Sequence, residues 1–322
     1  MTFAGSSERA EARLVPEAGY EIDTFRVSGF PRRPGVALAR SLSLAARAPA
    51  ACRRILDRRR PHVVLGGGGY VAGPMVLAAW TKRIPAALTE ADAHLGFANR
   101  LAVPFAQRVF LAFPVDGREG GKYRVVGRPV PARSRAVDPA TARMLFGLPP
   151  EGRVLLVFGG SQGARALNEW AVAAYGDDGP SVLHVAGERD YDALRPRVRR
   201  GDYKLLAFTN DFGAALAAAD LVVARAGGSV WEIAAAGKPA VLVPYPHATA
   251  DHQSKNAQYF VERGAAVVVR EPLDALSATV DALLADDERR AAMQSAIAAA
   301  ARPDAADEIA EELITIARAA RR

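Results

Sequence analysis

Short apolar runs followed by polar or glycine-rich loops recur along the whole chain. Helical patterns separate most of these runs, which predicts parallel strands joined by crossover helices. We therefore predict an α/β protein with two doubly wound Rossmann-like domains that face each other across a cleft. The predicted strands lie at 61–65, 85–88, 109–112, 123–127, 153–158, 182–187, 205–209, 220–224, 241–244 and 265–269.

The stretch 225–256 carries the densest group of polar loops. Strand 220–224 runs into a Gly-Gly-Ser turn, and strand 241–244 runs into a loop rich in histidine, aspartate, glutamine and asparagine. Because ligands of parallel sheets bind outside the carboxyl ends of the strands, we expect these two loops to hold a substrate.

Each of these loops also has a purely structural interpretation. Ser229 and Glu232 have the spacing of a capping box, although Glu232 could equally take the hydroxyls of a ribose. In the second loop Asp251 could cap the next helix, whereas the neutral hydrogen-bonding side chains would suit a sugar. Metal binding by His247 and His252 is a minor alternative, since they lack a typical ligand spacing.

A second candidate site follows the apolar strand 153–158. The loop Gly159–Ala164 joins this strand to a helix, and backbone N–H groups and the helix dipole at such a junction favour phosphate. The spacing matches neither a dinucleotide fold nor a P-loop, so we predict phosphate binding without triphosphate hydrolysis. The structural alternative is that Ser161 only caps the helix.

The first half of the chain offers weaker chemistry. Four glycines, Gly66 to Gly69, follow a predicted strand and would allow close backbone approach. Glu90 and Asp92 follow the next strand and are weak candidates for acid–base work. Asp92 could instead cap the helix that runs through Asn99, an explanation that fits Glu90 less easily.

The net charge of +7 is concentrated in one segment. Residues 31–60 contain nine arginines and one acidic residue, Asp57. A basic amphipathic helix here could contact an anionic membrane or nucleic acid, or simply cover a sheet. The chain has one cysteine, Cys52, so it forms no internal disulfide, and no run of about 18 apolar residues predicts a membrane span.

The basic, proline-rich segment 128–133 is the predicted linker. We expect a first domain at 1–131 and a second at 132–322, with the last helix a candidate to pack back on the first domain. Residues 1–6 look like the end of a strand, so the first domain reads as truncated at its N-terminus. The alternative is an edge strand that comes first in the fold.

Four motifs, in order along nearly the whole chain, resemble those of the MurG family of bacterial transferases. They are Gly68–Pro74 (GGYVAGP), Gly159–Arg165 with Asn168 (GGSQGAR…N), Glu232–Pro239 (EIAAAGKP) and Asp251–Gln253 with Asn256 (DHQ…N). The resemblance implies the GT-B fold and inverting, metal-independent transfer of N-acetylglucosamine, without a cofactor, from its UDP carrier to a lipid-linked muramoyl-pentapeptide of peptidoglycan synthesis. A UDP-sugar epimerase of the same fold and a non-catalytic UDP-sugar-binding remnant are the alternatives.

The resemblance also assigns functions to individual residues. It places Ser161, Gln162 and Gly163 at the diphosphate, Thr209 beside the uracil, Gly228 and Ser229 at the α-phosphate, and Glu232 at the ribose. Gln253, with His252 and Asn256, would contact the sugar. Asp92 stands where the family often has an asparagine near the cleft, and Arg128 or Arg133 would replace a family arginine that aligns with Pro131.

Two further expectations follow from the resemblance. The family's first glycine-rich loop, which carries a histidine proposed to deprotonate the acceptor, has no counterpart here, so the catalytic base is unknown. Members dock peripherally on the cytoplasmic face of the membrane. We therefore favour a membrane contact through residues 31–60 and Trp80 over a nucleic acid partner.

Overall fold

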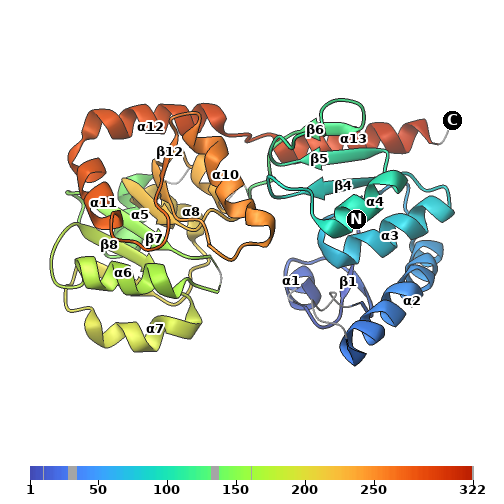
Figure 1. Cartoon of the computed structure of the whole chain (residues 1–322), viewed down its shortest axis with the longest axis horizontal. Coiled ribbons are helices and arrows are strands. Elements are labelled where there is room, and N and C mark those ends of the chain that lie inside the picture. Colours follow the sequence, from blue (N-terminus) through green and yellow to red (C-terminus); the bar gives the residue numbers. More distant parts are fainter. Residues whose placement is uncertain (10, 28–34, 132–137, 161, 321–322) are drawn as a thin grey trace. The chain divides into compact units, whose positions relative to one another are not determined.

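The computed structural model describes residues 1–9, 11–27, 35–131, 138–160 and 162–320, and the chain forms two compact units (Figure 1). Unit 1 comprises Met1–Val126 and Asp307–Arg322, and unit 2 comprises Gly127–Ala306. The chain therefore leaves unit 1 once and returns to it with its last helix.

Unit 1 is built on a parallel four-stranded sheet in the order β3-β4-β5-β6. The strands are β3 (Val64–Gly66), β4 (Ala86–Glu90), β5 (Arg108–Leu111) and β6 (Tyr123–Val125). A separate parallel pair consists of β1 (Phe3–Ser6) and β2 (Ile22–Phe25). The helices are α1 (Glu11–Glu17), α2 (Val36–Arg59), α3 (Gly69–Thr81), α4 (Phe97–Ala102) and the short 3-10 helix Val103–Phe105.

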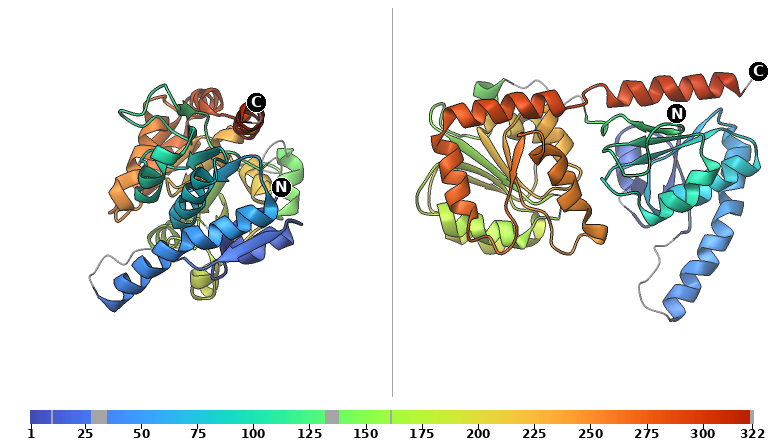
Figure 2. Two further views of the ribbon diagram at one scale, coloured as in Figure 1. Left: turned by 90° about the vertical axis from the view of Figure 1, so that its right-hand side faces the viewer. Right: turned by 45° about the horizontal axis from the view of Figure 1, so that its top comes forward.

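Two helices distant in sequence complete unit 1. The basic segment forms one continuous helix, α2, which buries Cys52 and Leu56 against α3. The last helix, α13 (Ala305–Ala319), lies beside the sheet (Figure 2) and inserts Ile309 into its core. The Glu312 carboxylate of α13 accepts hydrogen bonds from Arg108 at 2.6 Å and Arg124 at 3.1 Å, so β5 and β6 hold this helix.

Unit 2 contains one parallel six-stranded sheet in the order β12-β11-β10-β7-β8-β9. From β7 the chain adds strands in one direction, then crosses back and adds β10 to β12 on the other side. This is the strand order of a Rossmann fold, with its switch point between β7 and β10. The predicted α/β class with two Rossmann-like domains is thus confirmed.

The strands of unit 2 are short; β7, β10 and β11 are wholly apolar and buried, whereas the edge strands β9 and β12 are partly exposed. They are β7 (Val154–Phe158), β8 (Ser181–Val185), β9 (Tyr203–Leu206), β10 (Leu221–Ala224), β11 (Ala240–Leu242) and β12 (Ala266–Val268). The helices around them are α5 (Pro139–Leu145), α6 (Arg165–Tyr175), α7 (Glu188–Leu194), α8 (Phe212–Ala218), α9 (Val230–Ala235), α10 (His252–Val261), α11 (Leu276–Ala285) and α12 (Asp287–Ala300). Sequence reasoning did not anticipate β2 or α7.

Candidate functional site

The loops that follow β7 and β10 leave the sheet at its switch point. They are Gly159–Ala164 and Arg225–Ser229, and the strands before them are hydrogen-bonded neighbours. The second polar loop predicted from the sequence follows β11, the next strand along. All three loops therefore lie at one edge of the unit 2 sheet, as expected for a ligand site of this fold.

The Gly159–Ala164 loop is a tight turn that requires glycine. The Gly163 N–H donates to the Gly160 carbonyl at 2.9 Å, and both glycines have positive φ, +69° and +89°. A Cβ on Gly163 would lie 2.1 Å from the carbonyl oxygen of Ala186, which follows β8. The loop is therefore pressed against the neighbouring strand, and α6 begins directly after it. Gln162 is exposed in this loop, while Ser161 lies outside the described residues.

Arg128 joins the predicted site from the start of unit 2. A Cβ on Gly228 would lie 1.4 Å from Nη1 of Arg128, so the guanidinium covers the glycine in the Arg225–Ser229 loop. This contact brings a positive charge to the loop that precedes α9. Arg133, the other candidate for this function, lies outside the described residues.

Arg225 ties the loop after β10 to the loop after β11. Its buried guanidinium donates to the carbonyls of Val243 at 3.3 Å and Pro244 at 3.2 Å, and it pairs with Glu271 at 2.5 Å. Sequence reasoning did not single out this residue. The sequence did offer one signal for it, because Arg225 directly follows an apolar strand. A charged side chain that is buried at such a position needs hydrogen-bond or ion-pair partners.

Gln253 and Asn256 strengthen the same connection. The Asn256 side chain is fully buried and donates to the Ala226 carbonyl at 3.1 Å. The Gln253 Oε1 accepts from the Tyr245 N–H at 2.9 Å, and its Nε2 lies 3.9 Å from where a Cβ of Gly227 would stand. The predicted sugar-binding residues therefore meet the Gly-Gly-Ser turn.

The predicted helix caps are wrong in three places. Ser229 and Asp251 are the N-cap residues of α9 and α10 but make no side-chain capping hydrogen bond, and Asp92 does not lie at the start of α4. At Ser229 the backbone is already helical, with φ −65° and ψ −10°, and so lacks the extended conformation typical of a capping residue. At α4 the cap position belongs to Gly96 and not to Asp92.

The remaining predicted residues of unit 2 lie on the same edge of the sheet. Thr209 follows β9, and its Oγ1 accepts from the Asp211 N–H at 3.0 Å at the start of α8. Glu232 is half-buried in the first turn of α9. The His252 Nδ1 donates to the Thr249 carbonyl at 2.8 Å, because a carbonyl oxygen can only accept.

Glu90 in unit 1 is a structural acceptor. Its Oε1 accepts from the N–H groups of Ala91 and Asp92, and its Oε2 accepts from the Gly96 N–H at 2.8 Å and the Asn99 side chain at 2.9 Å. These four donors occupy both carboxylate oxygens, which argues against Glu90 as a catalytic base. Asp92 lies half-buried in the same loop.

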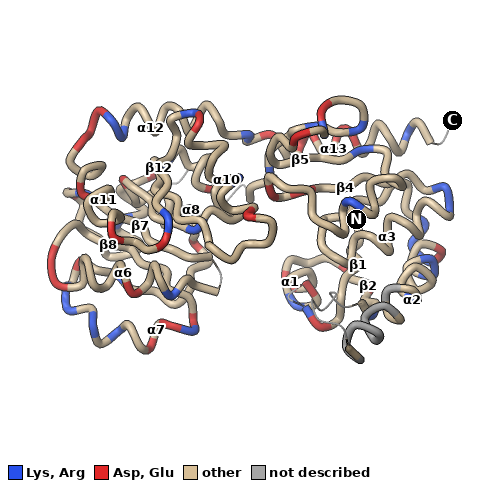
Figure 3. Tube along the Cα trace, in the orientation of Figure 1, with Lys and Arg blue, Asp and Glu red and all other residues tan. Residues whose placement is uncertain are grey.

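The basic helix α2 is only partly neutralised. Arg58 and Arg59 pair with Asp23 at 2.6 and 2.7 Å, and Arg59 hydrogen bonding is the main cause that lowers the pKa of Asp23. Arg53 and Arg54 are exposed on the same half of the helix, where basic positions gather in Figure 3. Within the described ranges, no helix is long and apolar enough to span a membrane.

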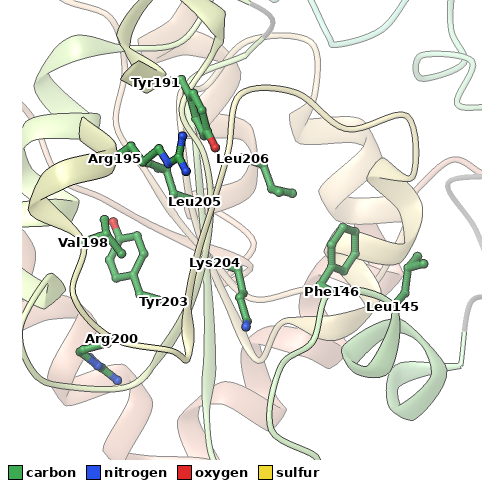
Figure 4. Close-up of a pocket in the computed structure, with 10 residues that line it drawn as sticks. All are labelled: Leu145, Phe146, Tyr191, Arg195, Val198, Arg200, Tyr203, Lys204, Leu205 and Leu206. Atoms are coloured by element: carbon green, nitrogen blue, oxygen red, sulfur yellow. The ribbon is translucent and has the colours of Figure 1, made fainter. Parts of the chain in front are cut away.

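Two cavities lie away from these loops. One of about 470 Å³ runs along the edge strand β9 in unit 2 and is lined by Tyr191, Arg195, Tyr203 and Lys204 (Figure 4). The other, of about 450 Å³ and almost wholly apolar, lies between α3 and α4 in unit 1. Among the described residues, no group of three or more His, Cys, Asp or Glu side chains is placed to hold a metal ion.

Two family models match the chain. The glycosyltransferase family 28 C-terminal domain matches residues 154–309, and the N-terminal domain of the same family matches residues 2–111. Both the family and the two-domain arrangement agree with the resemblance seen in the motifs.

Curated relatives and solved structures agree with these models. The UDP-N-acetylglucosamine–N-acetylmuramyl-(pentapeptide) pyrophosphoryl-undecaprenol N-acetylglucosamine transferase of Salinibacter ruber is 40% identical, over 98% of this chain and 88% of that protein. The enzyme of the same name from Rubrobacter xylanophilus is 38% identical, over 99% of this chain and 96% of that protein.

Among solved structures, Acinetobacter baumannii MurG has a TM-score of 0.76 at 26% identity and covers 98% of this chain and 90% of its own. The UDP-GlcNAc 2-epimerase of Neisseria meningitidis, bound to UDP-GlcNAc, has a TM-score of 0.60 at 15% identity, over 98% of this chain and 99% of its own, which shows a shared fold alone. The chain belongs to the MurG family of UDP-N-acetylglucosamine–N-acetylmuramyl-(pentapeptide) pyrophosphoryl-undecaprenol N-acetylglucosamine transferases.

Proposed function

We propose that this chain transfers N-acetylglucosamine from UDP-N-acetylglucosamine to the lipid-linked muramoyl-pentapeptide, a step of peptidoglycan synthesis. The observation that carries this proposal is the 38–40% identity, over nearly the whole chain, to relatives named for this reaction. The enzyme class is that of a UDP-N-acetylglucosamine-dependent hexosyltransferase.

The Gly159–Ala164 loop is the proposed site of the donor's diphosphate. The loop opens the 11-residue helix α6, whose N-terminal N–H groups and dipole favour an anion. Arg128, against Gly228, adds a positive charge at the neighbouring loop. When the glycosidic bond breaks, negative charge develops on the leaving UDP, so donors fixed at this position would stabilise the transition state.

The nucleoside and the sugar are assigned to the other loops. Thr209 would lie beside the uracil, Ser229 beside the α-phosphate, and Glu232 at the ribose hydroxyls. Gln253 is supported as a sugar contact because its Oε1 is held by the Tyr245 N–H, which leaves the Nε2 group as a donor. His252 donates through Nδ1, so the neutral ring presents Nε2 as an acceptor.

Asn256 serves this site differently. Its amide is buried and bonded to the Ala226 carbonyl, so it would hold the two loops together rather than reach a ligand. For the chemical step, inversion requires a base on the acceptor side, in line with the bond that breaks. With Glu90 occupied by four donors, Asp92 is the remaining candidate named from the sequence.

A peripheral contact with the cytoplasmic face of the membrane is the second part of the proposal. The aromatic and aliphatic residues Trp80, Phe97 and Leu101 are 55%, 63% and 57% exposed, and the last two line the apolar cavity of unit 1. Pro49 of α2 also lines this cavity, so the exposed arginines of α2 belong to the same region. Apolar insertion and attraction to anionic lipids would then act together.

Vesicle binding tests this contact. Co-sedimentation with anionic vesicles should fall when Trp80 and Phe97 are both replaced by Ser. The unmodified protein should also bind neutral vesicles of the same size less than anionic ones. Met144→Ser is the matched control, because Met144 is 74% exposed but belongs to unit 2. Equal binding by all three proteins would disprove the membrane assignment.

Activity is tested with UDP-N-acetylglucosamine and a short-chain lipid acceptor. The protein should release UDP only when the acceptor is present, and mass spectrometry should show one added N-acetylhexosamine. Gln253→Ala should lower kcat/KM at least about tenfold, whereas Gln258→Ala, on the exposed side of α10, should not. Conversion of the donor without acceptor would instead support the epimerase alternative, and absence of both reactions would refute the proposal.

A further inference from the structure

A chain of buried hydrogen bonds lies directly beneath the Gly159–Ala164 loop. It begins at Tyr203 on β9, passes through His184 on β8 and ends at Asn168 in the first turns of α6. His184 is completely buried in β8, between Leu183 and Val185. A buried polar side chain in a core of this kind is retained only when its hydrogen bonds are satisfied.

The direction of each hydrogen bond follows from Asn168. Its Nδ2 donates to the Ala186 carbonyl at 2.9 Å and to the Asp190 carboxylate at 3.0 Å, so its Oδ1 faces the His184 Nε2 at 3.0 Å. An amide oxygen only accepts, and the proton of His184 therefore sits on Nε2. The unprotonated Nδ1 accepts from the Tyr203 hydroxyl at 2.9 Å.

The imidazole must be neutral for this arrangement. Burial lowers the pKa of His184 to about 3, so it carries no charge at physiological pH. Tyr203 is buried and lines the cavity shown in Figure 4, and burial keeps its hydroxyl protonated by raising its pKa. His184 and Tyr203 are thus each fixed in one protonation state.

The Asn168 end of this chain of hydrogen bonds adjoins the Gly159–Ala164 loop. The Ala186 carbonyl that accepts from Asn168 is the same atom that a Cβ on Gly163 would approach to 2.1 Å. Asp190, the second acceptor, pairs with Arg189 at 3.1 Å and with Arg165, the first residue of α6, at 3.4 Å. The loop is therefore fixed on two sides, by the end of β8 and by the start of α6.

We propose that His184 and Asn168 are positioning residues that hold the Gly159–Ala164 loop in the shape that binds the donor's diphosphate. Neither residue touches the ligand, and the inference rests on the proposed function. A loop that relaxes away from Ala186 would lose aligned N–H donors for phosphate. The contacts to uracil and ribose, which come from other loops, would remain.

The experiment compares the affinities of UDP and uridine, measured by calorimetry and by ligand-observed NMR. In His184→Phe we expect the dissociation constant of UDP to rise at least about tenfold while that of uridine changes less than about twofold. His184→Gln, which keeps an N–H donor near the Nε2 position, should recover most of the lost UDP affinity. Tyr175→Phe is the control for a lost buried hydrogen bond, since Tyr175 bonds Asp281 at the far end of α6.

The outcomes separate this inference from the proposed function. Equal losses for UDP and uridine, or no loss for UDP, would overturn the positioning function while leaving the donor site in place. Failure of the unmodified protein to bind UDP would overturn the proposed function and this inference with it. If His184→Phe does not fold, the dissociation constants of UDP and uridine are measured in Asn168→Ala instead. The expected and refuting results are the same.

Discussion

His184 should make unit 2 sensitive to mild acid. In the folded protein its pKa is about 3, because the ring is buried between Tyr203 of β9 and Asn168 of α6. In the unfolded chain the pKa of histidine is about 6.5. The unfolded state therefore binds the extra proton, so stability is fully present above about pH 6.5 and is lost as the pH falls towards 3.

Between pH 7 and pH 5 this difference costs about 2 kcal/mol of the free energy of unfolding. Among the described residues of unit 2, the carboxylates with a shifted pKa are all shifted downward, mainly by hydrogen bonds, and stay ionised above pH 5: Asp138, Asp190, Asp202 and Asp287.

Urea unfolding at pH 7, 6 and 5 measures the effect. Two of the three tryptophans, Trp170 and Trp231, belong to unit 2, so fluorescence in a Trp80→Phe background follows that unit alone. In His184→Gln the loss between pH 7 and 5 should shrink by about 2 kcal/mol, or about 1 M in the urea midpoint. Replacement of the exposed His247 by Gln should leave the loss unchanged. Parallel losses in the unmodified protein and in His184→Gln would refute the reasoning.

Three further substitutions test the loops and the last helix. Gly163→Ala should destabilise unit 2 by at least about 2 kcal/mol and weaken UDP binding, whereas Gly152→Ala, with φ +86° and open space, should cost about 1 kcal/mol in thermal unfolding. Arg225→Gln should raise the KM for the donor and destabilise unit 2 by about 2 kcal/mol, because the buried carbonyls of Val243 and Pro244 lose their charged donor. An unchanged KM would contradict the conclusion that Arg225 ties the two loops together. Glu312→Gln should release α13 to limited proteolysis, with a loss of about 1 kcal/mol, while Glu311→Gln on the exposed face should not.

The strands that carry the site could be predicted because their signals are local. Runs such as Val154–Phe158 and Leu221–Ala224 are wholly apolar and end at glycine or a charged residue, which is typical of a strand buried on both faces. The short strand β2, Ile22–Phe25, escaped prediction because only two of its residues are apolar and Asp23 lies between them. Its aspartate becomes explicable only when Arg58 and Arg59 of α2 are brought to it.

The capping predictions failed for a related reason. Ser229 and Glu232 have the right spacing for a capping box, but the chain enters α9 already in helical conformation and the Ser229 side chain makes no capping hydrogen bond. Entry geometry is set by the Gly-Gly turn and by the tertiary contacts of that loop, including Arg128 and Asn256. Spacing along the chain carries no information about these partners, so a motif that is locally self-consistent can be overridden by packing.

The sequence motif alone does not explain how the Gly159–Ala164 loop keeps its shape. The glycines explain how Gly159–Ala164 can turn, since only glycine fits at Gly163 against the Ala186 carbonyl. They do not explain why the turn keeps one shape, because glycine is the residue with the most backbone freedom to lose. That constraint comes from Asn168, which belongs to the loop's motif, and from His184, whose position in β8 gave no sign that the two residues act together. A loop built from glycines keeps one shape only when less flexible side chains outside the loop hold its surroundings, and the comparison of UDP with uridine measures this effect.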